Sequence, residues 1–265
     1  MQQVTSADGT GIAYDRSGSG PAVVLVGGGF AVRSDPILAG LAQALSPRFT
    51  VFNYDRRGRG DSGDTPPYAV EREVEDLDAL IREAGGRAFL FGASSGAGLA
   101  LETAARSGGA DKLALHEPPY DVDEAGSRIP ADFVVHLDEL IAQDRRSDAV
   151  AYFMTTGVGL AEEEVAQMRA APFWPGLEAL AHTLSYDGRI VGFDLPDRSL
   201  PVERWKAIDV PVLVTGGGAS PDRMRNVARA VAGALPDATF RSLPGQSHQL
   251  EPAAVVPLLR DFFLG

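Results

Sequence analysis

Residues 92–96 read Gly-Ala-Ser-Ser-Gly, so Ser94 lies at the centre of a Gly-x-Ser-x-Gly pattern. A serine hydroxyl is a weak nucleophile, and a sharp strand-to-helix turn exposes it to a base. The pattern has the flanks of such a turn, because an apolar run precedes it and a segment with helical character follows it. Glycines suit a turn in which side chains would crowd the strand or the helix. We therefore predict Ser94 as a nucleophile for acyl transfer, and the off-centre Ser95 as its rival hydroxyl.

An activated serine needs a base, and the chain has four histidines. His136 and His182 lie on predicted helices among apolar neighbours, and His116 lies within a predicted strand. His248 differs, because it follows the last predicted strand in a loop that leads into the last helix. Such a loop lies at the sheet edge where Ser94 should project. Elimination therefore predicts His248 as the base.

Two carboxylates compete to orient the histidine. Glu117 ends the apolar segment 112–117, and a carboxylate at that place is costly unless it is paired. Asp222 follows a later strand, where such an acid is more often found. However, Ser-Pro-Asp at 220–222 is also typical of a helix start, which explains Asp222 without catalysis. We favour Glu117 and keep Asp222 as the alternative.

Backbone amides near Ser94 could stabilise an oxyanion. Ser95 opens the predicted helix, where N–H groups lack helical partners. Three glycines at 27–29 follow the apolar run 22–26 and allow close approach of the backbone to a substrate. We predict the amides of Ser95 and Gly29 as the two donors, with Gly28 next.

The elements that position these residues alternate between strand and helix. Strands are expected at 3–6, 12–15, 22–26, 50–54, 88–91, 112–117, 212–215 and 238–243. Helices are expected at 36–45, 70–83, 95–106, 221–235 and 253–263. Alternation of this kind predicts an α/β fold with a mostly parallel, doubly wound sheet and a site at the strand carboxyl ends.

The alternation stops between residues 120 and 202, where helices are expected at 131–143, 148–155, 161–169 and 175–184. We predict a helical cap at 120–202, inserted into a core formed by 1–119 and 203–265. Most aromatic residues of the cap must form its own core. As substrate contacts we predict Phe30, Tyr120, Met154 and Trp174, with Trp174 as the favoured cap residue.

Composition narrows the functional classes. The chain has 265 residues, 45% hydrophobic residues, no cysteine and a net charge of −12. Disulfides and thiolate chemistry are therefore excluded, and binding to nucleic acid or to anionic membranes is disfavoured. No apolar run approaches the roughly 20 residues of a membrane helix, and residues 1–4 do not resemble a secretory signal. We expect a cytoplasmic protein and leave its oligomeric state open.

Residues 58–63 match Gly-x-Gly-x-x-Gly, which could suggest a dinucleotide site. The pattern follows the second parallel strand, and Pro66 and Pro67 prevent a helix from opening at its third glycine. A rigid turn is the better interpretation. A phosphate-binding Gly-x-x-x-x-Gly-Lys and a His-Glu-x-x-His are both missing from the sequence. We therefore predict neither a cofactor nor a metal.

These motifs together resemble the α/β-hydrolase superfamily over essentially the whole chain. The resemblance rests on the serine turn 92–96, the Asp-x-Arg-Gly-x-Gly-x-Ser turn within 55–63, the loop 27–30 and the histidine loop 245–248. Gly27-Gly28 stands where many members have His-Gly, and no acid lies at 219–220, where most members carry it. The second departure favours Glu117, because certain dehalogenases and zearalenone-type lactonases place a glutamate after the preceding strand.

Ser94-Ser95-Gly96 and His116-Glu117 are locally similar to the zearalenone-type lactonases. The resemblance implies a serine hydrolase for a small apolar ester or lactone. C–C bond hydrolysis, thioester cleavage and cofactor-free perhydrolysis are alternatives on the same residues. A ligand receptor or a cyclase without hydrolysis is a further alternative. Dehalogenase and epoxide hydrolase chemistry would need an aspartate at position 94 and is disfavoured.

Overall fold

The structure, a computed structural model, describes residues 1–122 and 129–265. Within them, eight strands form one sheet in the order β1-β2-β4-β3-β5-β6-β7-β8. The strands are β1 (Gln2–Thr5), β2 (Gly11–Gly18), β3 (Ala22–Val26), β4 (Thr50–Tyr54), β5 (Ala88–Ala93), β6 (Ala110–His116), β7 (Val212–Gly217) and β8 (Ala238–Leu243). β2 pairs antiparallel with both β1 and β4, and the other strands pair in parallel. The predicted mostly parallel, doubly wound sheet is confirmed.

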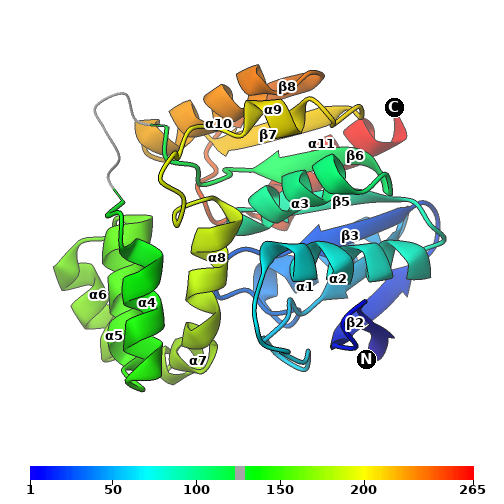
Figure 1. Ribbon diagram of the computed structural model, residues 1–265. Coiled ribbons are helices and arrows are strands. Elements are labelled where there is room, and N and C mark those ends of the chain that lie inside the picture. The colour runs from blue at the N-terminus through cyan, green and yellow to red at the C-terminus, as the bar shows by residue number, and fades with distance from the viewer. Residues whose placement is uncertain (123–128) are drawn as a thin grey trace.

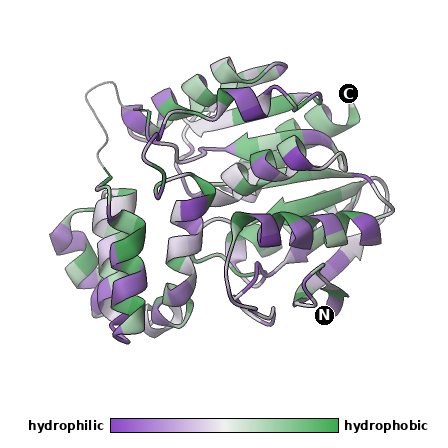
Figure 2. Ribbon diagram, in the orientation of Figure 1, coloured by the Kyte–Doolittle hydropathy of each residue, from purple (hydrophilic) through white to green (hydrophobic). Residues whose placement is uncertain are grey.

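Helices cover both faces of the sheet (Figure 1). The core helices are α1 (Pro36–Leu45), α2 (Val70–Glu83), α3 (Ser95–Arg106), α10 (Asp222–Ala234) and α11 (Pro252–Leu264). Alternate residues of one strand enter different cores: Val24 packs in the cluster with α2, α3 and α10, and Leu25 packs in the cluster with α1 and α11. The strands are therefore apolar on both faces, as Figure 2 shows by their green colour between the helices.

The register of the parallel strands brings their carboxyl ends to one edge. The Cα pairs at that edge are Val26 with Gly92, Ala93 with His116, His116 with Thr215, and Gly217 with Leu243. The loops after β3, β5, β6, β7 and β8 thus leave the sheet side by side, and they carry the residues selected from the sequence.

A separate group of helices lies beside this edge (Figure 1). It contains α4 (Phe133–Ala142), α5 (Arg146–Tyr152), the π-helical turn η1 (Phe153–Val158), α6 (Glu162–Arg169), α7 (Trp174–Leu180) and the 3₁₀ turn η2 (Ala181–Thr183). We call this group the helical lobe. Residues 123–128 of the predicted cap lie outside the described part of the chain.

The helix α8 (Leu184–Ile190) connects the helical lobe to the core, because it packs against α4 and also against α2 and α3. The sequence predicted the last cap helix at 175–184, and that helix is in fact divided, with α8 continuing to Ile190. The apolar pattern of the sequence does not extend into α8, because the buried face of α8 contains Asp187. This carboxylate forms ion pairs with Arg56 and Arg59. The short helix α9 (Val202–Trp205), which the sequence also did not predict, leads back to β7. No helix in the described ranges is both long and apolar enough to cross a membrane.

Candidate active site

Ser94 occupies a strained turn between β5 and α3, with φ 55° and ψ −130°. Its neighbours must be small. A Cβ on Gly92 would lie 2.6 Å from Ala97 Cα, and a Cβ on Gly96 would collide with the carbonyl oxygen of Val26. This strain is typical of a turn that holds a nucleophile above a sheet edge.

Glu117 lies directly after β6 and binds the histidine loop. Its Oε2 is 2.8 Å from His248 Nδ1, and its Oε1 accepts a hydrogen bond of 2.8 Å from the Gly217 N–H. Burial by itself would raise the pKa of Glu117, but the hydrogen bonds that it accepts, above all the one from His248, outweigh burial and lower the pKa to about 2. The carboxylate is therefore ionised and fixed on both oxygens. An ionised carboxylate at Nδ1 leaves the other ring nitrogen of His248 as the proton acceptor.

Asp222, the alternative acid, lies elsewhere. Its side chain is 84% exposed and pairs with Arg225, whereas the side chain of Glu117 is 1% exposed. Asp222 begins α10, where a carboxylate is favoured by the helix dipole. The carboxylate that contacts His248 is thus Glu117.

Ser94 and His248 share the same sheet edge, but no hydrogen bond joins the Ser94 hydroxyl to His248 among the described residues. The His248 side chain is 37% exposed, contacts Glu117 through Nδ1 and stacks on the His116 ring at 6.1 Å. A hydrogen bond between nucleophile and base often shortens only when substrate is bound. The arrangement can therefore support general-base chemistry at Ser94.

The loop after β3 runs beside Ser94. A Cβ on Gly28 would lie 2.8 Å from Ser94 Cβ, so only glycine permits this approach. Neither the Gly29 N–H nor the Ser95 N–H has an acceptor within residues 1–122 and 129–265. Two unpaired amides next to a serine turn could bind an oxyanion.

His116 binds the histidine loop through the backbone of Ser247. It contacts Thr215 Oγ1 through Nδ1 at 3.0 Å and the Ser247 carbonyl oxygen through Nε2 at 3.2 Å. Burial lowers the pKa of His116 to about 4, so the ring is neutral near pH 7. Because a carbonyl oxygen can only accept, the ring proton lies on Nε2, and Nδ1 is the acceptor nitrogen beside the Thr215 hydroxyl, which also donates to the Leu115 carbonyl oxygen at 3.1 Å. His116 therefore anchors the residue that precedes His248.

His116, Glu117 and His248 also offer ligand atoms within 4.8 Å of one another, a spacing that could suit a metal ion. Hydrogen bonds already engage both nitrogens of His116, both oxygens of Glu117 and Nδ1 of His248. A metal would have to displace several of these bonds. The cluster is better suited to orient His248 than to ligate a metal.

Phe30 is a predicted substrate contact next to the glycine loop, which consists of residues 27–29 after β3. A second predicted contact, Met154, is the neighbour of Phe153 in η1. Phe30 follows Gly29 with φ 60°, and its ring meets the Phe153 ring edge-on at 5.5 Å. The Phe153 ring also lies 3.5 Å from the position of a Cβ on Gly29. Met154, its neighbour in η1, is buried in the apolar core instead. Phe153 rather than Met154 therefore faces the glycine loop.

The other two predicted contacts, Trp174 and Tyr120, have packing partners in the structure. Trp174 is buried in the helical lobe, where its indole N–H donates a 2.8 Å hydrogen bond to Ser147 Oγ. Tyr120 packs edge-on against Trp205 at 5.3 Å. It lines a cavity of about 440 Å³ whose walls do not include Ser94 or His248. The geometry thus assigns packing contacts to both side chains.

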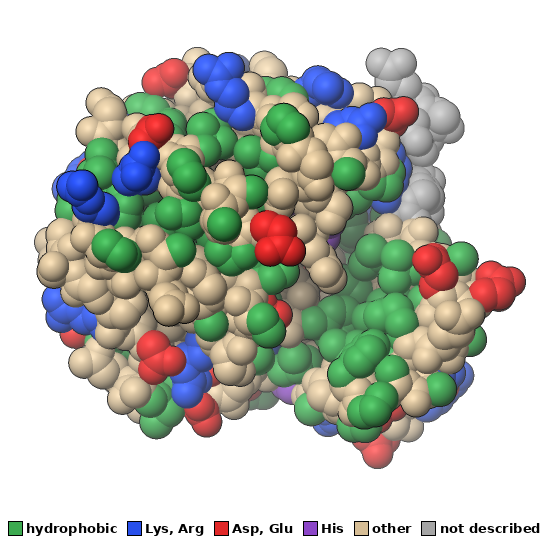
Figure 3. All heavy atoms as spheres, turned by 180° about the vertical axis from the view of Figure 1, so that it is seen from behind, with side chains coloured by type: hydrophobic (Ala, Val, Ile, Leu, Met, Phe, Trp, Pro, Cys, Tyr) green, Lys and Arg blue, Asp and Glu red, His purple; other side chains and the backbone are tan. Residues whose placement is uncertain are grey.

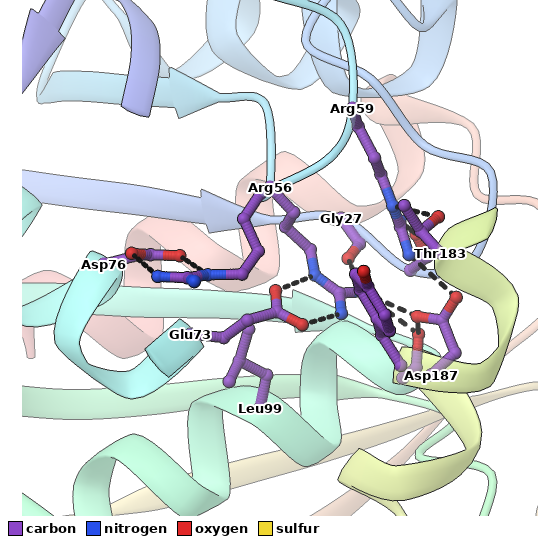
Figure 4. Close-up of polar contacts among 12 residues, drawn as sticks. Gly27, Arg56, Arg59, Glu73, Asp76, Leu99, Thr183 and Asp187 are labelled. Carbon is purple, nitrogen blue, oxygen red and sulfur yellow. Dashed lines mark hydrogen bonds and ion pairs between the residues drawn. The ribbon is translucent and has the colours of Figure 1, made fainter. Parts of the chain in front are cut away.

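A buried ion network lies behind the glycine loop (Figure 4). Asp187 of α8 receives hydrogen bonds of 2.7 Å from Arg56 and 2.7 Å from Arg59. Arg56 also forms a bidentate pair with Glu73, and Arg59 donates to Thr183 Oγ1. The two arginines belong to the turn that the sequence identified only as rigid. The sequence signal for this network was the presence of three arginines in a turn after a buried strand, since buried cations need carboxylate partners.

Comparison with known proteins places this geometry in a family. The sequence profile of the Alpha/beta hydrolase family matches residues 23–258. The chain belongs to the α/β-hydrolase family. The crystal structure of an alpha/beta hydrolase from Sphaerobacter thermophilus DSM 20745 is similar, with 53% identity and a TM-score of 0.91 over 99% of this chain and 100% of that chain.

Two further α/β-hydrolase comparisons are more distant. An uncharacterized hydrolase, YraK of Bacillus subtilis (strain 168), is 36% identical over 104 residues, which span 37% of each chain. The enol-lactonase from Burkholderia xenovorans LB400 is 23% identical, with a TM-score of 0.69 and full coverage of both chains, and this likeness shows the fold alone.

The surface of this α/β-hydrolase is hollowed between its core and its helical lobe. Figure 3 shows the cleft from behind, with hydrophobic side chains gathered on the side of the helical lobe. An apolar wall of this kind suits a substrate with an apolar part.

Proposed function

We propose that this α/β-hydrolase cleaves a small apolar carboxylic ester or lactone through an acyl-enzyme on Ser94. The observation that carries the proposal is the hydrogen bond between Glu117 and His248 at the edge where Ser94 projects. An ionised carboxylate on Nδ1 keeps the proton at that nitrogen and leaves Nε2 free to accept one.

In the first half of the reaction, His248 Nε2 takes the proton from Ser94 as Oγ forms a bond with the substrate carbonyl carbon. The negative charge moves to the carbonyl oxygen, where the Gly29 and Ser95 N–H groups donate to it. The tetrahedral intermediate then loses the alkoxide, which takes the proton from His248. In a lactone the leaving hydroxyl stays attached to the acyl group.

In the second half, His248 takes a proton from water as the water oxygen attacks the acyl-enzyme. The Ser94 Oγ–carbon bond breaks, the carboxylic acid leaves, and Ser94 regains its proton from His248. Glu117 keeps its negative charge throughout and stabilises the imidazolium that forms in each half. No cofactor is needed to balance the reaction.

Two observations support an apolar ester or lactone. Phe30 and Phe153 stand beside the glycine loop, and the cleft has an apolar wall (Figure 3). Thioesters, C–C bonds and perhydrolysis remain the alternatives that a substrate panel would separate.

Active-site labelling tests the nucleophile. The protein is incubated with a fluorophosphonate and its intact mass is measured. We expect one adduct in the wild type and in Ser95→Ala, and none in Ser94→Ala. An adduct that survives Ser94→Ala, or its complete loss in Ser95→Ala alone, would contradict the assignment. Hydrolysis of p-nitrophenyl esters and simple lactones of increasing size then defines the substrate class.

A further inference from the structure

Asp187 is a buried carboxylate that the proposed reaction does not use. It lies on α8, which packs against both the helical lobe and the core. Its Oδ1 accepts hydrogen bonds from Arg56 Nη1 at 2.7 Å and from Ser95 Oγ at 2.6 Å, and its Oδ2 accepts one from Arg59 Nη2 at 2.7 Å. Arg56 and Arg59 belong to the turn 55–63, and Ser95 directly follows the nucleophile Ser94.

Arg59 connects Asp187 to the glycine loop. Its Nη1 donates a 2.5 Å hydrogen bond to the Gly28 carbonyl oxygen, while its Nη2 binds Asp187. The Gly28 carbonyl and the Gly29 N–H belong to one planar, trans peptide, so they point in opposite directions. Arg59 therefore helps to fix the direction in which the Gly29 N–H points, together with the Ala31 N–H, which donates to the same carbonyl oxygen at 3.2 Å. A cation on the carbonyl also polarises the peptide and strengthens its N–H as a donor.

Ser95 connects Asp187 to the other proposed donor. The Ser95 hydroxyl is buried and directed to Asp187, so it is not available as a nucleophile. Its bond to Asp187 holds the first residue of α3, whose backbone N–H is the second oxyanion donor in the proposed mechanism. One carboxylate thus holds both halves of the proposed oxyanion hole.

The Asp187 carboxylate also lies close to Gly29 itself. A Cβ on Gly29 would lie 3.5 Å from Asp187 Oδ2, so the carboxylate lies directly against the glycine loop. The side chains of Arg56, Arg59, Glu73 and Asp187 are all buried, and the two cations balance the two carboxylates. A buried network without net charge can hold its members in one geometry.

We propose that Asp187 is a positioning residue for the oxyanion hole, acting through Arg59 on the Gly29 amide and through the Ser95 hydroxyl on the Ser95 amide. The proposal rests on the proposed hydrolase function. A residue that orients donors toward developing charge affects the transition state more than the bound substrate. Its loss should therefore lower kcat more than it raises KM.

The test compares Asp187→Asn with Asp76→Asn. Asp76 is a matched control, because it is also buried and accepts two hydrogen bonds from an arginine, Arg57, away from the glycine loop. We expect Asp187→Asn to lower kcat for a p-nitrophenyl ester about 10- to 100-fold with KM within about twofold. The affinity for a trifluoromethyl ketone, which forms an oxyanion on the serine, should fall by a similar factor. Asp76→Asn should lower the melting temperature but leave kcat and inhibitor affinity unchanged.

A second variant covers the case in which Asp187→Asn does not fold. Ser95→Ala keeps the amide and removes only the hydroxyl bond to Asp187, so we expect a folded protein with kcat lowered about 3- to 10-fold. Unchanged kcat in Ser95→Ala, or a kcat loss in Asp187→Asn no larger than in Asp76→Asn, would overturn the proposal. A rise confined to KM would overturn it as well. Failure of the proposed function looks different, because the wild type itself would then form no fluorophosphonate adduct.

Discussion

Glu117 Oε2 lies 2.8 Å from His248 Nδ1 although the two residues are 131 positions apart in the chain. The contact follows from the sheet, because β6 ends at His116 and neighbours β7, whose Gly217 donates to the second oxygen of Glu117. Glu117 thus orients His248, whereas residues 219–220, where most members of the family carry the acid, are Ala and Ser.

Replacement of this carboxylate should affect catalysis far more than replacement of Asp222. In Glu117→Gln the amide can donate to Nδ1, which moves the proton to Nε2 and removes the base. We expect kcat/KM to fall about 10²- to 10⁴-fold. Asp222→Asn changes an exposed residue and should stay within about twofold of the wild type. Steady-state hydrolysis of one ester by both variants checks this, and a larger loss in Asp222→Asn would refute Glu117 as the acid.

Gly28→Ala should remove activity by moving the glycine loop. Its Cβ would lie 2.8 Å from Ser94 Cβ and 2.8 Å from the Ala93 carbonyl oxygen, so the loop must shift away from the nucleophile. We expect kcat to fall about 100-fold or more. Gly233→Ala serves as the control, because its Cβ meets nothing within 4 Å and lies within α10. That variant should keep full activity and gain about 0.5 to 1 kcal/mol in the free energy of unfolding. Equal activity of the two variants would argue against a role for the glycine loop.

Phe153→Ala should weaken binding of the apolar part of the substrate. The ring faces the glycine loop, and its removal should raise KM for a preferred apolar ester about tenfold, with kcat within about threefold. Trp174→Phe is the matched aromatic control. Trp174 is hydrogen-bonded inside the helical lobe, so this variant should lose stability while KM stays unchanged. The opposite pattern of KM values would restore Trp174 as the substrate contact.

His116 should make stability depend on pH. Burial lowers its pKa to about 4 from the usual 6.5, so the unfolded chain takes up a proton near pH 6.5 and the folded chain only near pH 4. Stability from this residue is therefore complete above pH 6.5 and is lost as the pH falls toward 4. The wild type should lose about 3 kcal/mol more free energy of unfolding between pH 7 and 4 than His116→Gln, which does not titrate. Urea titrations at several pH values measure this difference, and parallel curves for the two proteins would contradict it.

The strand and helix positions in the core were predictable because each element has its own local pattern. The run 22–26 is apolar throughout and is β3 without change of bounds, and 36–45 and 70–83 match α1 and α2. Glu117 could also be preferred over Asp222 from its immediate sequence neighbours. A carboxylate that closes a buried strand must find a partner, and His248 is that partner in the structure.

The helical lobe and the ion network were not predictable in the same way. Asp187 lies on the buried face of α8 and forms ion pairs there. A search for apolar residues at helical spacing therefore does not identify α8 as a buried helix. Arg56 and Arg59 are 131 and 128 positions from Asp187, and nothing in the sequence pairs them. Trp174 and Met154 were selected as large side chains near a cleft, but composition cannot tell which face of a helix a side chain occupies.

The charge on α8 also limits which parts of the chain can be exchanged between relatives. Arg59 is buried, and among residues 1–122 and 129–265 its carboxylate partner is Asp187 alone. A cap transplanted from another α/β-hydrolase without a carboxylate at this place would leave that cation unpaired, at a cost of several kcal/mol. The natural junction for a chimera therefore lies before Leu184, so that α8 stays with the core and only the preceding helices are replaced.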